Sequence, residues 1–308
     1  MEKQEVSGAA SPGVGAVSIS DAIDELLRFT LSSTLSGDSD ISDLALSSDF
    51  SSGLLLLDNA AVTTPHHFND NEVGNGVPSY PLYKHLAKVL DKSFKAGLFP
   101  RREDMGTIFP PDDGPRIKET EWDKMISKTG FELCSMYGNV NFELNVQEPF
   151  FSQLKDRCHR NLFQGLGYDG IGRLLGMART AGTVLDTLPP SRSVLASSAA
   201  KSYQPDVKDS ALTDAARALA KHAERSSEGW WGHLQGNDSN KNQLASEVIN
   251  RLLEDCCWMN IHLIQPYGPV FEIRVHEGYG ARWSHNGSKF IGFLEPYTAD
   301  GFSKGWKH

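Results

Sequence analysis

The dipeptide Asn-Gly at positions 286–287 constrains the fold most, because it stands between two stretches with the alternating pattern of β-strands. Asn-Gly favours a two-residue type I′ turn, which needs positive φ at both positions, and so indicates an antiparallel hairpin. Upstream, V-F-E-I-R-V-H at 270–276 alternates apolar and polar residues, as a strand with one buried face does. The sequence therefore predicts a three-stranded antiparallel sheet near the C-terminus.

Two apolar stripes at helical spacing precede this sheet. The first runs from about Ser210 to about Gly229, and the second begins around Ser239. The segment D-C-C-W-M-N-I-H-L-I at 255–264 is apolar nearly all round, which predicts that the second helix ends in a buried position. Residues 210–308 are therefore expected to form a helical pair that covers a sheet, within a chain of the α+β class.

Charge is distributed unevenly along the 308 residues. Residues 1–76 hold twelve acidic and two basic side chains, whereas the rest of the chain holds 27 and 28. The acidic segment is rich in Ser, Gly and Asp and poor in aromatic residues, which predicts that most of it is disordered. The neutral body does not have the strong positive charge that is typical of nucleic-acid-binding domains.

One helix is predicted within the acidic segment, near residues 18–34. Ser18 and Asp21 fit its N-terminal cap, and Ile23, Leu27 and Leu31 fall on one face. Further on, D-S-D-I-S-D-L-A-L-S-S-D-F at 38–50 alternates acidic and apolar residues, as in segments that bind a protein partner. Residues 18–58 have two interpretations: a site for a protein partner, or a solvated linker whose one helix packs on the body.

The segment 77–164 begins with helical patterns and reaches a strand pattern that leads into a short helix. That last part, F-E-L-N-V-Q-E-P-F-F-S-Q-L-K-D at 142–156, resembles the start of an ASCH domain, a PUA-like β-barrel. Together with Y-P-L-Y-K-H-L at 80–86 and F-E-I-R-V-H-E-G-Y-G-A-R-W at 271–283, it resembles a plant group of RNA-binding ASCH-domain proteins. The resemblance implies RNA binding. The absence of a disulfide framework among the four cysteines indicates a nuclear or cytoplasmic location.

The signature that lines the ligand cleft of ASCH domains, G-x-K-x-x-E-x-R, is missing. Its glycine would fall on Arg157, its lysine on His159, its glutamate on Leu162 and its arginine on Gln164. We therefore expect residues 77–164 to be a truncated ASCH-like fragment, and no cleft residue can be assigned by resemblance.

Residues 165–170 match the pattern G-x-G-x-x-G, which has two interpretations. A dinucleotide site would need a buried strand directly before it and an acidic residue about 20 positions later. The preceding R-C-H-R-N-L-F-Q is polar and basic, so a short, closely packed helix is favoured. The rest of the 165–209 segment, rich in Gly, Pro and Ser, is expected to be a linker.

RNA-contact candidates lie on the polar side of the predicted C-terminal sheet, where cations and aromatic rings are interleaved. The alternative is an aromatic core with a solvated polar face. The candidates are Arg274, His276, Arg282, Trp283, His285 and Lys289.

No catalytic residue, metal site or cofactor is predicted. The four cysteines form no C-x-x-C motif, and the ten histidines show no zinc-ligand spacing with them. No apolar run approaches the ~20 residues of a membrane-spanning helix.

The function expected from the sequence is RNA binding by a non-enzymatic member of the ASCH family. The first alternative is a coactivator-like adaptor that acts through the acidic segment. A hydrolase of nucleosides or RNA is least favoured, because related enzymes use the cleft residues that this chain does not have.

Overall fold

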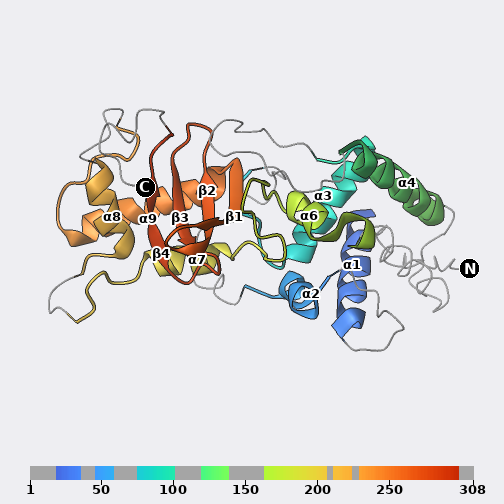
Figure 1. Ribbon diagram of the computed structural model, residues 1–308, viewed down its shortest axis with the longest axis horizontal. Helices are drawn as coiled ribbons and strands as arrows, with labels where there is room; N and C mark the ends of the chain where they lie inside the picture. Colours follow the sequence, from blue (N-terminus) through green and yellow to red (C-terminus); the bar gives the residue numbers. More distant parts are fainter. Residues whose placement is uncertain are drawn as a thin grey trace, which may run out of the picture.

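The computed structural model describes residues 19–35, 46–58, 75–100, 119–138, 163–206, 211–223 and 229–297. In these parts of the chain, helices and one antiparallel sheet form two adjoining lobes (Figure 1). The predicted α+β class is confirmed. The acidic residues before α1 and the ASCH-like stretch at 142–156 lie outside the described residues. None of the helices described has the length and hydropathy needed to cross a membrane.

The first lobe is helical and has its own apolar core. It consists of α1 (Ile19–Leu35), α2 (Ser48–Leu55), α3 (Leu82–Ala96), α4 (Glu119–Gly138) and α6 (Gly165–Leu174). These helices enclose a continuous cluster of buried apolar side chains. α3 ends as the sequence predicts, because Gly97 takes the left-handed conformation that stops a helix.

Helix α1 confirms the helix predicted near 18–34, and its apolar face is buried within this chain. Ile23, Leu26, Leu27 and Leu31 lie in the core of the helical lobe, where α1 packs on α2 and α3. This matches the interpretation in which the helix packs on the body. The other interpretation of 18–58 requires these side chains to be exposed for a protein partner, and they are not exposed.

The G-x-G-x-x-G pattern forms the first turns of α6. Phe163 and Gln164 before it are in a helical turn, so the strand that a dinucleotide site needs is not there. Gly167 has φ 58° and ψ −164°, which kinks the helix at that point. The closely packed helix favoured by the sequence is the arrangement observed.

The second lobe packs helices on one face of a four-stranded sheet (Figure 1). The helices are α7 (Arg192–Ala199), α8 (Asp214–Ala223) and α9 (Asp238–Asp255). The strands, in the order β1-β2-β3-β4, are β1 (Trp258–Ile264), β2 (Gly268–Arg274), β3 (Gly280–Ser284) and β4 (Phe290–Leu294). All neighbouring strands are antiparallel.

Two sequence predictions are wrong in this lobe. The segment read as the buried end of the second helix is β1, because α9 ends at Asp255 and Cys256 is already extended. β1 is buried over most of its length and has only two polar residues, Asn260 and His262, and periodicity cannot distinguish so short a run from a buried helix end. The predicted linker contains α7, which the Ser191 side chain caps by accepting a hydrogen bond from the Val194 amide.

The hairpin predicted at Asn-Gly is confirmed, but its turn is longer than two residues. β3 ends at Ser284 and β4 begins at Phe290. Within the loop, the Gly287 amide donates to the Ser284 carbonyl over 2.8 Å, and Gly287 has φ 73°. The Asn286 side chain accepts hydrogen bonds from the Ser288 amide and hydroxyl, which fixes the loop locally.

The two lobes are joined by backbone and side-chain hydrogen bonds. The Val77 amide donates to the Leu253 carbonyl over 2.9 Å, and Arg192 Nε donates to the Val77 carbonyl over 2.5 Å. Tyr80 of the helical lobe donates its hydroxyl to the Pro189 carbonyl over 2.7 Å. Burial, and next the nearby Asp58 carboxylate, raise the pKa of Tyr80 to about 12.

The segment 177–184 runs along the free side of β1. Amides of Ala178 and Val184 donate to the carbonyls of Met259 and Ile261, and the Leu263 amide donates to Gly182. The outer edge of β1 is therefore hydrogen-bonded along most of its length.

Candidate functional site

An ionic cluster crosses the sheet on the face opposite the helices. Glu272 of β2 lies at its centre, with Arg274 Nε 2.7 Å from Oε1 and Arg282 Nη2 of β3 2.7 Å from Oε2. His262 of β1 places Nε2 3.3 Å from the same Oε2. All four side chains are buried, and Glu272 is fully enclosed. Glu272 pairs with Arg282 across β2 and β3, and Arg274 follows Glu272 by two residues on β2. His262 pairs with Val270, two residues before Glu272. Strand alternation therefore puts the four side chains on one face.

The charge of Glu272 is stabilised by these neighbours. Burial by itself raises the pKa of a carboxyl group, but the His262 hydrogen bond and the charges of Arg274 and Arg282 together outweigh it. The pKa of Glu272 is lowered to about 2. The cluster therefore contains an ionised carboxylate at any physiological pH.

The cluster continues into a polar contact at β1. The Asn260 side chain donates to the hydroxyls of Thr180 and Thr183 over 2.8 and 3.0 Å. Since both threonines belong to the segment beside β1, this contact fixes that segment on the sheet. The role indicated for the whole buried network is to hold the strands and their cover in register.

Burial corrects the placement of three RNA-contact candidates. Arg274 and Arg282 belong to the enclosed ionic cluster, and Trp283 is fully buried and donates its Nε1 proton to the Leu195 carbonyl. The alternation of residues predicted the two faces of the sheet, but it could not show that the polar face is covered. These three side chains are not on an exposed surface.

The other three candidates are exposed but lie at two ends of the sheet. His276 is in the turn between β2 and β3, whereas His285 and Lys289 are in the turn between β3 and β4. β3 separates the two turns, so the six predicted residues do not form one surface. RNA contact by the exposed three stays a prediction.

A second polar arrangement joins α8 to the end of β4. His222, in the last turn of α8, places Nδ1 2.7 Å from Oε1 of Glu295, directly after β4. Trp231 donates its Nε1 proton to the same oxygen over 2.9 Å. Packing holds the imidazole in place, since its ring lies 5.3 Å from the Trp231 ring and 6.1 Å from the Phe293 ring, centroid to centroid.

The His222–Glu295 pair differs from the ionic cluster in being partly open to solvent. The two side chains are 18% and 16% exposed. Within the described residues, no group is hydrogen-bonded to His222 Nε2. A carboxylate that holds one imidazole nitrogen while the other faces a substrate is an arrangement suited to proton transfer.

Aromatic side chains next to this pair form a stack that is already filled. The Trp230 ring lies 4.4 Å from Tyr279 and nearly parallel to it, and the Arg251 guanidinium lies 4.0 Å from the Trp230 ring centre. Both faces of Trp230 are thus occupied by protein. The stack packs on Trp231, which lies beside His222, and leaves neither face of Trp230 free for a nucleobase.

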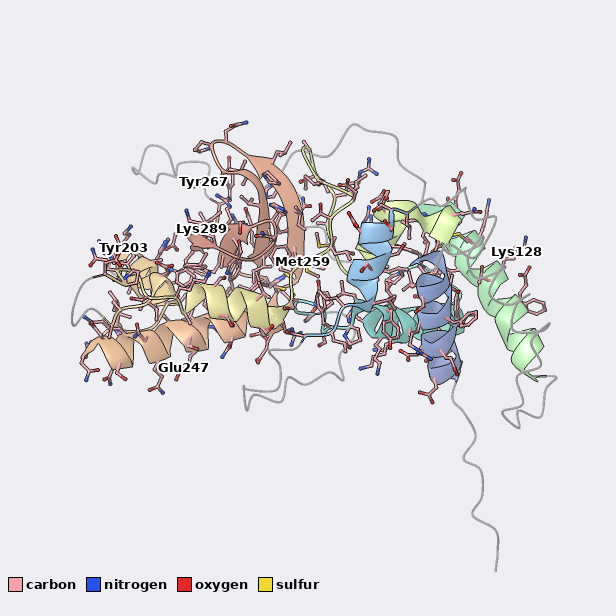
Figure 2. All side chains as sticks on the ribbon, turned by 90° about the horizontal axis from the view of Figure 1, so that it is seen from below. Lys128, Tyr203, Glu247, Met259, Tyr267 and Lys289 are labelled. Carbon is pink, nitrogen blue, oxygen red and sulfur yellow. The ribbon has the colours of Figure 1, made fainter. Side chains whose placement is uncertain are left out.

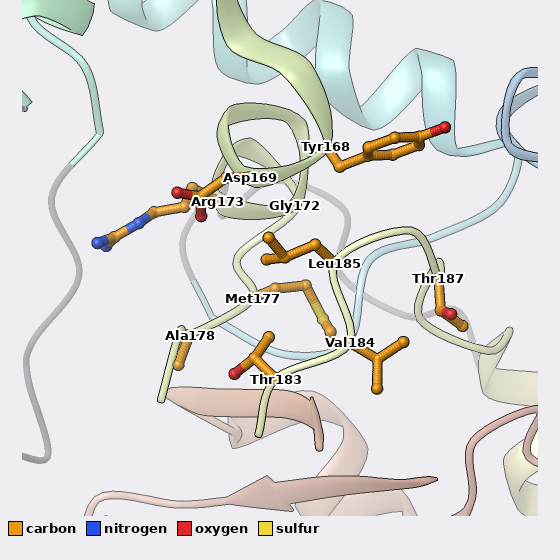
Figure 3. A pocket seen from close by; sticks show the side chains of 10 residues that line it. All are labelled: Tyr168, Asp169, Gly172, Arg173, Met177, Ala178, Thr183, Val184, Leu185 and Thr187. Carbon is orange, nitrogen blue, oxygen red and sulfur yellow. The ribbon is translucent and has the colours of Figure 1, made fainter. Parts of the chain in front are cut away.

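A pocket between α6 and the segment 177–187 is too small to be the site. Figure 3 shows Leu185 and Met177 among the side chains that fill the space below α6. Its volume of about 20 Å³ is room for about one water molecule. Nor do the described residues contain a group of three His, Cys, Asp or Glu side chains that could hold a metal ion.

Comparison with known proteins gives one family. Residues 201–295 match the model of the CdiA C-terminal tRNase toxin domain. The match covers α8, α9 and all four strands, and it includes both members of the His222–Glu295 pair. No curated protein matches the chain. No solved structure matches it either.

The matched family is described as tRNase, which counts against the expectation of a non-enzymatic protein. Sequence reasoning missed His222 and Glu295 as a pair. They are 73 positions apart, and neither stands in a recognisable motif. The folded contact between α8 and β4 is the signal that identifies them.

Proposed function

We propose that residues 201–295 form an RNA-cleaving unit in which His222 transfers protons and Glu295 orients it. The observation that carries the proposal is the half-open His222–Glu295 pair inside the stretch that resembles a tRNase toxin domain. The same resemblance suggests tRNA, or RNA of similar structure, as the substrate. RNA is also the ligand that the resemblance to ASCH-domain proteins implies.

RNA supplies its own nucleophile, which suits a site built around one histidine. His222 Nε2 would remove the proton of a ribose 2′-hydroxyl, whose oxygen then bonds to the adjacent phosphorus. The bond from phosphorus to the 5′-oxygen breaks, and that oxygen takes a proton from water, while the His222 imidazolium returns its proton to the solvent. The products are a 2′,3′-cyclic phosphate and a 5′-hydroxyl end. Glu295 would keep the Nδ1 proton in place and stabilise the imidazolium that forms.

The test is cleavage of a tRNA transcript by the full-length chain and its His222→Asn variant. The Asn amide can still donate to Glu295 from near the position of Nδ1, but it cannot transfer a proton. We expect the cleavage rate to fall at least about 100-fold, the lower range for loss of a general acid or base. The ends of the products, resolved on a sequencing gel, show whether a cyclic phosphate is formed.

The matched control is His233→Asn, which changes an exposed histidine of the same unit. It should cleave at the wild-type rate, and thermal unfolding should show both variants folded. Cleavage by His222→Asn at the wild-type rate would exclude His222 from the reaction. Binding of the transcript without cleavage would instead support the non-enzymatic RNA-binding function.

A further inference from the structure

Besides the buried ionic cluster, the sheet lobe has a charged surface. It is formed by three segments that are distant in sequence. Residues 201–203 pair with 212–214, since the Tyr203 amide donates to the Leu212 carbonyl and the Asp214 amide donates to the Lys201 carbonyl. This pairing sets Lys201 and Tyr203 beside the first turn of α8. The turn between β3 and β4 joins them, because Lys201 Nζ donates to the Ser288 carbonyl over 3.0 Å.

Three cations gather at this surface, and two of them act on one acidic residue. Lys201 and Lys289 are exposed, and both act on the Asp214 carboxyl. Burial raises the pKa of Asp214, and the two lysines oppose that effect. Arg217, one turn further along α8, adds the third positive charge. The bond to Ser288 uses one of the three N–H groups of Lys201, which leaves two for a ligand.

An exposed aromatic ring stands among these cations. Tyr203 is 44% exposed, and the Arg217 guanidinium lies 5.5 Å from its ring centre. Figure 2 shows Tyr203 and Lys289 in the sheet lobe, whereas Lys128 lies on α4 at the other end of the molecule. A guanidinium lies on one side of this ring, and part of the ring is open to solvent. Such a ring is a platform on which a base can stack.

We propose that Lys201, Tyr203, Arg217 and Lys289 bind unpaired nucleotides of RNA, with a base on Tyr203 and phosphates on the cations. The proposal rests on the RNA-cleaving function above and extends it by assigning a surface for the substrate. Helix α8 begins at this surface, and its last turn carries His222. By helix rise the two are about 12 Å apart, a distance that a few nucleotides span. Unpaired RNA is favoured over duplex because stacking on Tyr203 needs a base with a free face.

Binding is tested apart from cleavage with a fluorescein-labelled 12-mer of 2′-O-methyl RNA, which has no free 2′-hydroxyl. Fluorescence anisotropy with the full-length chain should give a Kd for the single strand at least about tenfold below that for its duplex. Lys201→Ala/Lys289→Ala should raise the Kd about tenfold and lower the slope of log K against log salt by about 1.4, at ~0.7 for each phosphate contact. Tyr203→Leu should raise the Kd about tenfold at unchanged slope.

The matched control is Lys92→Ala/Lys128→Ala, which removes two exposed lysines of the helical lobe and should leave the Kd unchanged. Equal affinity of wild type and both surface variants for the probe overturns the proposal. It is also overturned if poly-glutamate binds as tightly as the RNA probe and Tyr203→Leu has no effect on the Kd. His222→Asn should bind the probe normally. Binding that depends on the surface, without cleavage of tRNA by wild type, would sustain this proposal and refute the catalytic one. No binding by wild type would refute this one.

Discussion

Arg282 contacts Glu272 through two nitrogen atoms, with Nε 3.0 Å and Nη2 2.7 Å from the same carboxylate oxygen, Oε2. The other oxygen accepts from Arg274 of the same strand, so Arg282 makes the link from this enclosed carboxylate to β3. Burial costs each guanidinium its hydration, and the charge of the shared carboxylate compensates that loss for both.

Replacing Glu272 by Gln should therefore be strongly destabilising. The neutral amide leaves two buried guanidiniums without their shared counter-charge, and loss of one partner of a buried pair costs about 3–5 kcal/mol. Urea unfolding followed by tryptophan fluorescence measures the change in free energy of unfolding. Glu254→Gln, at an exposed position on α9, is the control and should cost less than about 0.5 kcal/mol. A loss of under 1 kcal/mol in Glu272→Gln would show that the cluster does not hold the sheet.

Stability should also fall in acid through the same residue. The pKa of Glu272 is about 2 in the folded chain, against 4.5 for a glutamate in the unfolded chain. The carboxylate therefore contributes its full stabilisation above pH 4.5. That contribution, about 3 kcal/mol, is lost as the pH falls from 4.5 to 2. Urea unfolding of wild type and Glu272→Gln at several pH values in this range measures it. The difference between the two proteins should shrink as the pH falls, and a constant difference would contradict the assignment.

Glycine is required at position 280 but not at position 292. A Cβ on Gly280 would overlap the backbone carbonyl of Ile273 on the neighbouring strand, whereas a Cβ on Gly292 meets nothing within 4 Å. Gly280→Ala should cost about 3 kcal/mol or more, since backbone must move to admit the methyl group. Gly292→Ala should be neutral or stabilising by up to about 1 kcal/mol. Thermal unfolding of the two variants compares them directly, and equal melting temperatures would be against the predicted close approach of β2 and β3.

Local sequence patterns predicted those elements whose signal is complete within a few residues. Gly97 ends α3 and the Asn-Gly pair lies in a hairpin loop, because turn chemistry is local. β1 was missed because Asn260 and His262 are its only polar residues, too few to distinguish a strand from the end of the preceding helix. Neither pattern carries information on what lies above the sheet, so Arg282 was assigned to an exposed face that is in fact buried. Trp283, the next residue of β3, lies on the opposite face, in the core under the helices.

The candidate site required the tertiary structure. Lys289 was predicted as an RNA contact from its place on the polar side of the predicted sheet, and it is exposed. Lys201, Tyr203 and Arg217 join it through a backbone pairing of 201–203 with 212–214 that no periodicity indicates. His222 and Glu295 meet because α8 packs along β4. Contacts of this kind depend on the packing of whole elements, which a single sequence does not specify by pattern alone.

The strip of chain at 177–184 also has a consequence for self-association. An outermost strand ordinarily presents a row of unused amide and carbonyl groups, on which a strand of another molecule can add. Here the donors of Ala178 and Val184 and the acceptor of Gly182 occupy that row on β1. A second copy could extend the sheet on this side only after segment 177–184 had dissociated from β1. The segment is therefore a barrier within the protein to edge-to-edge growth of fibrils.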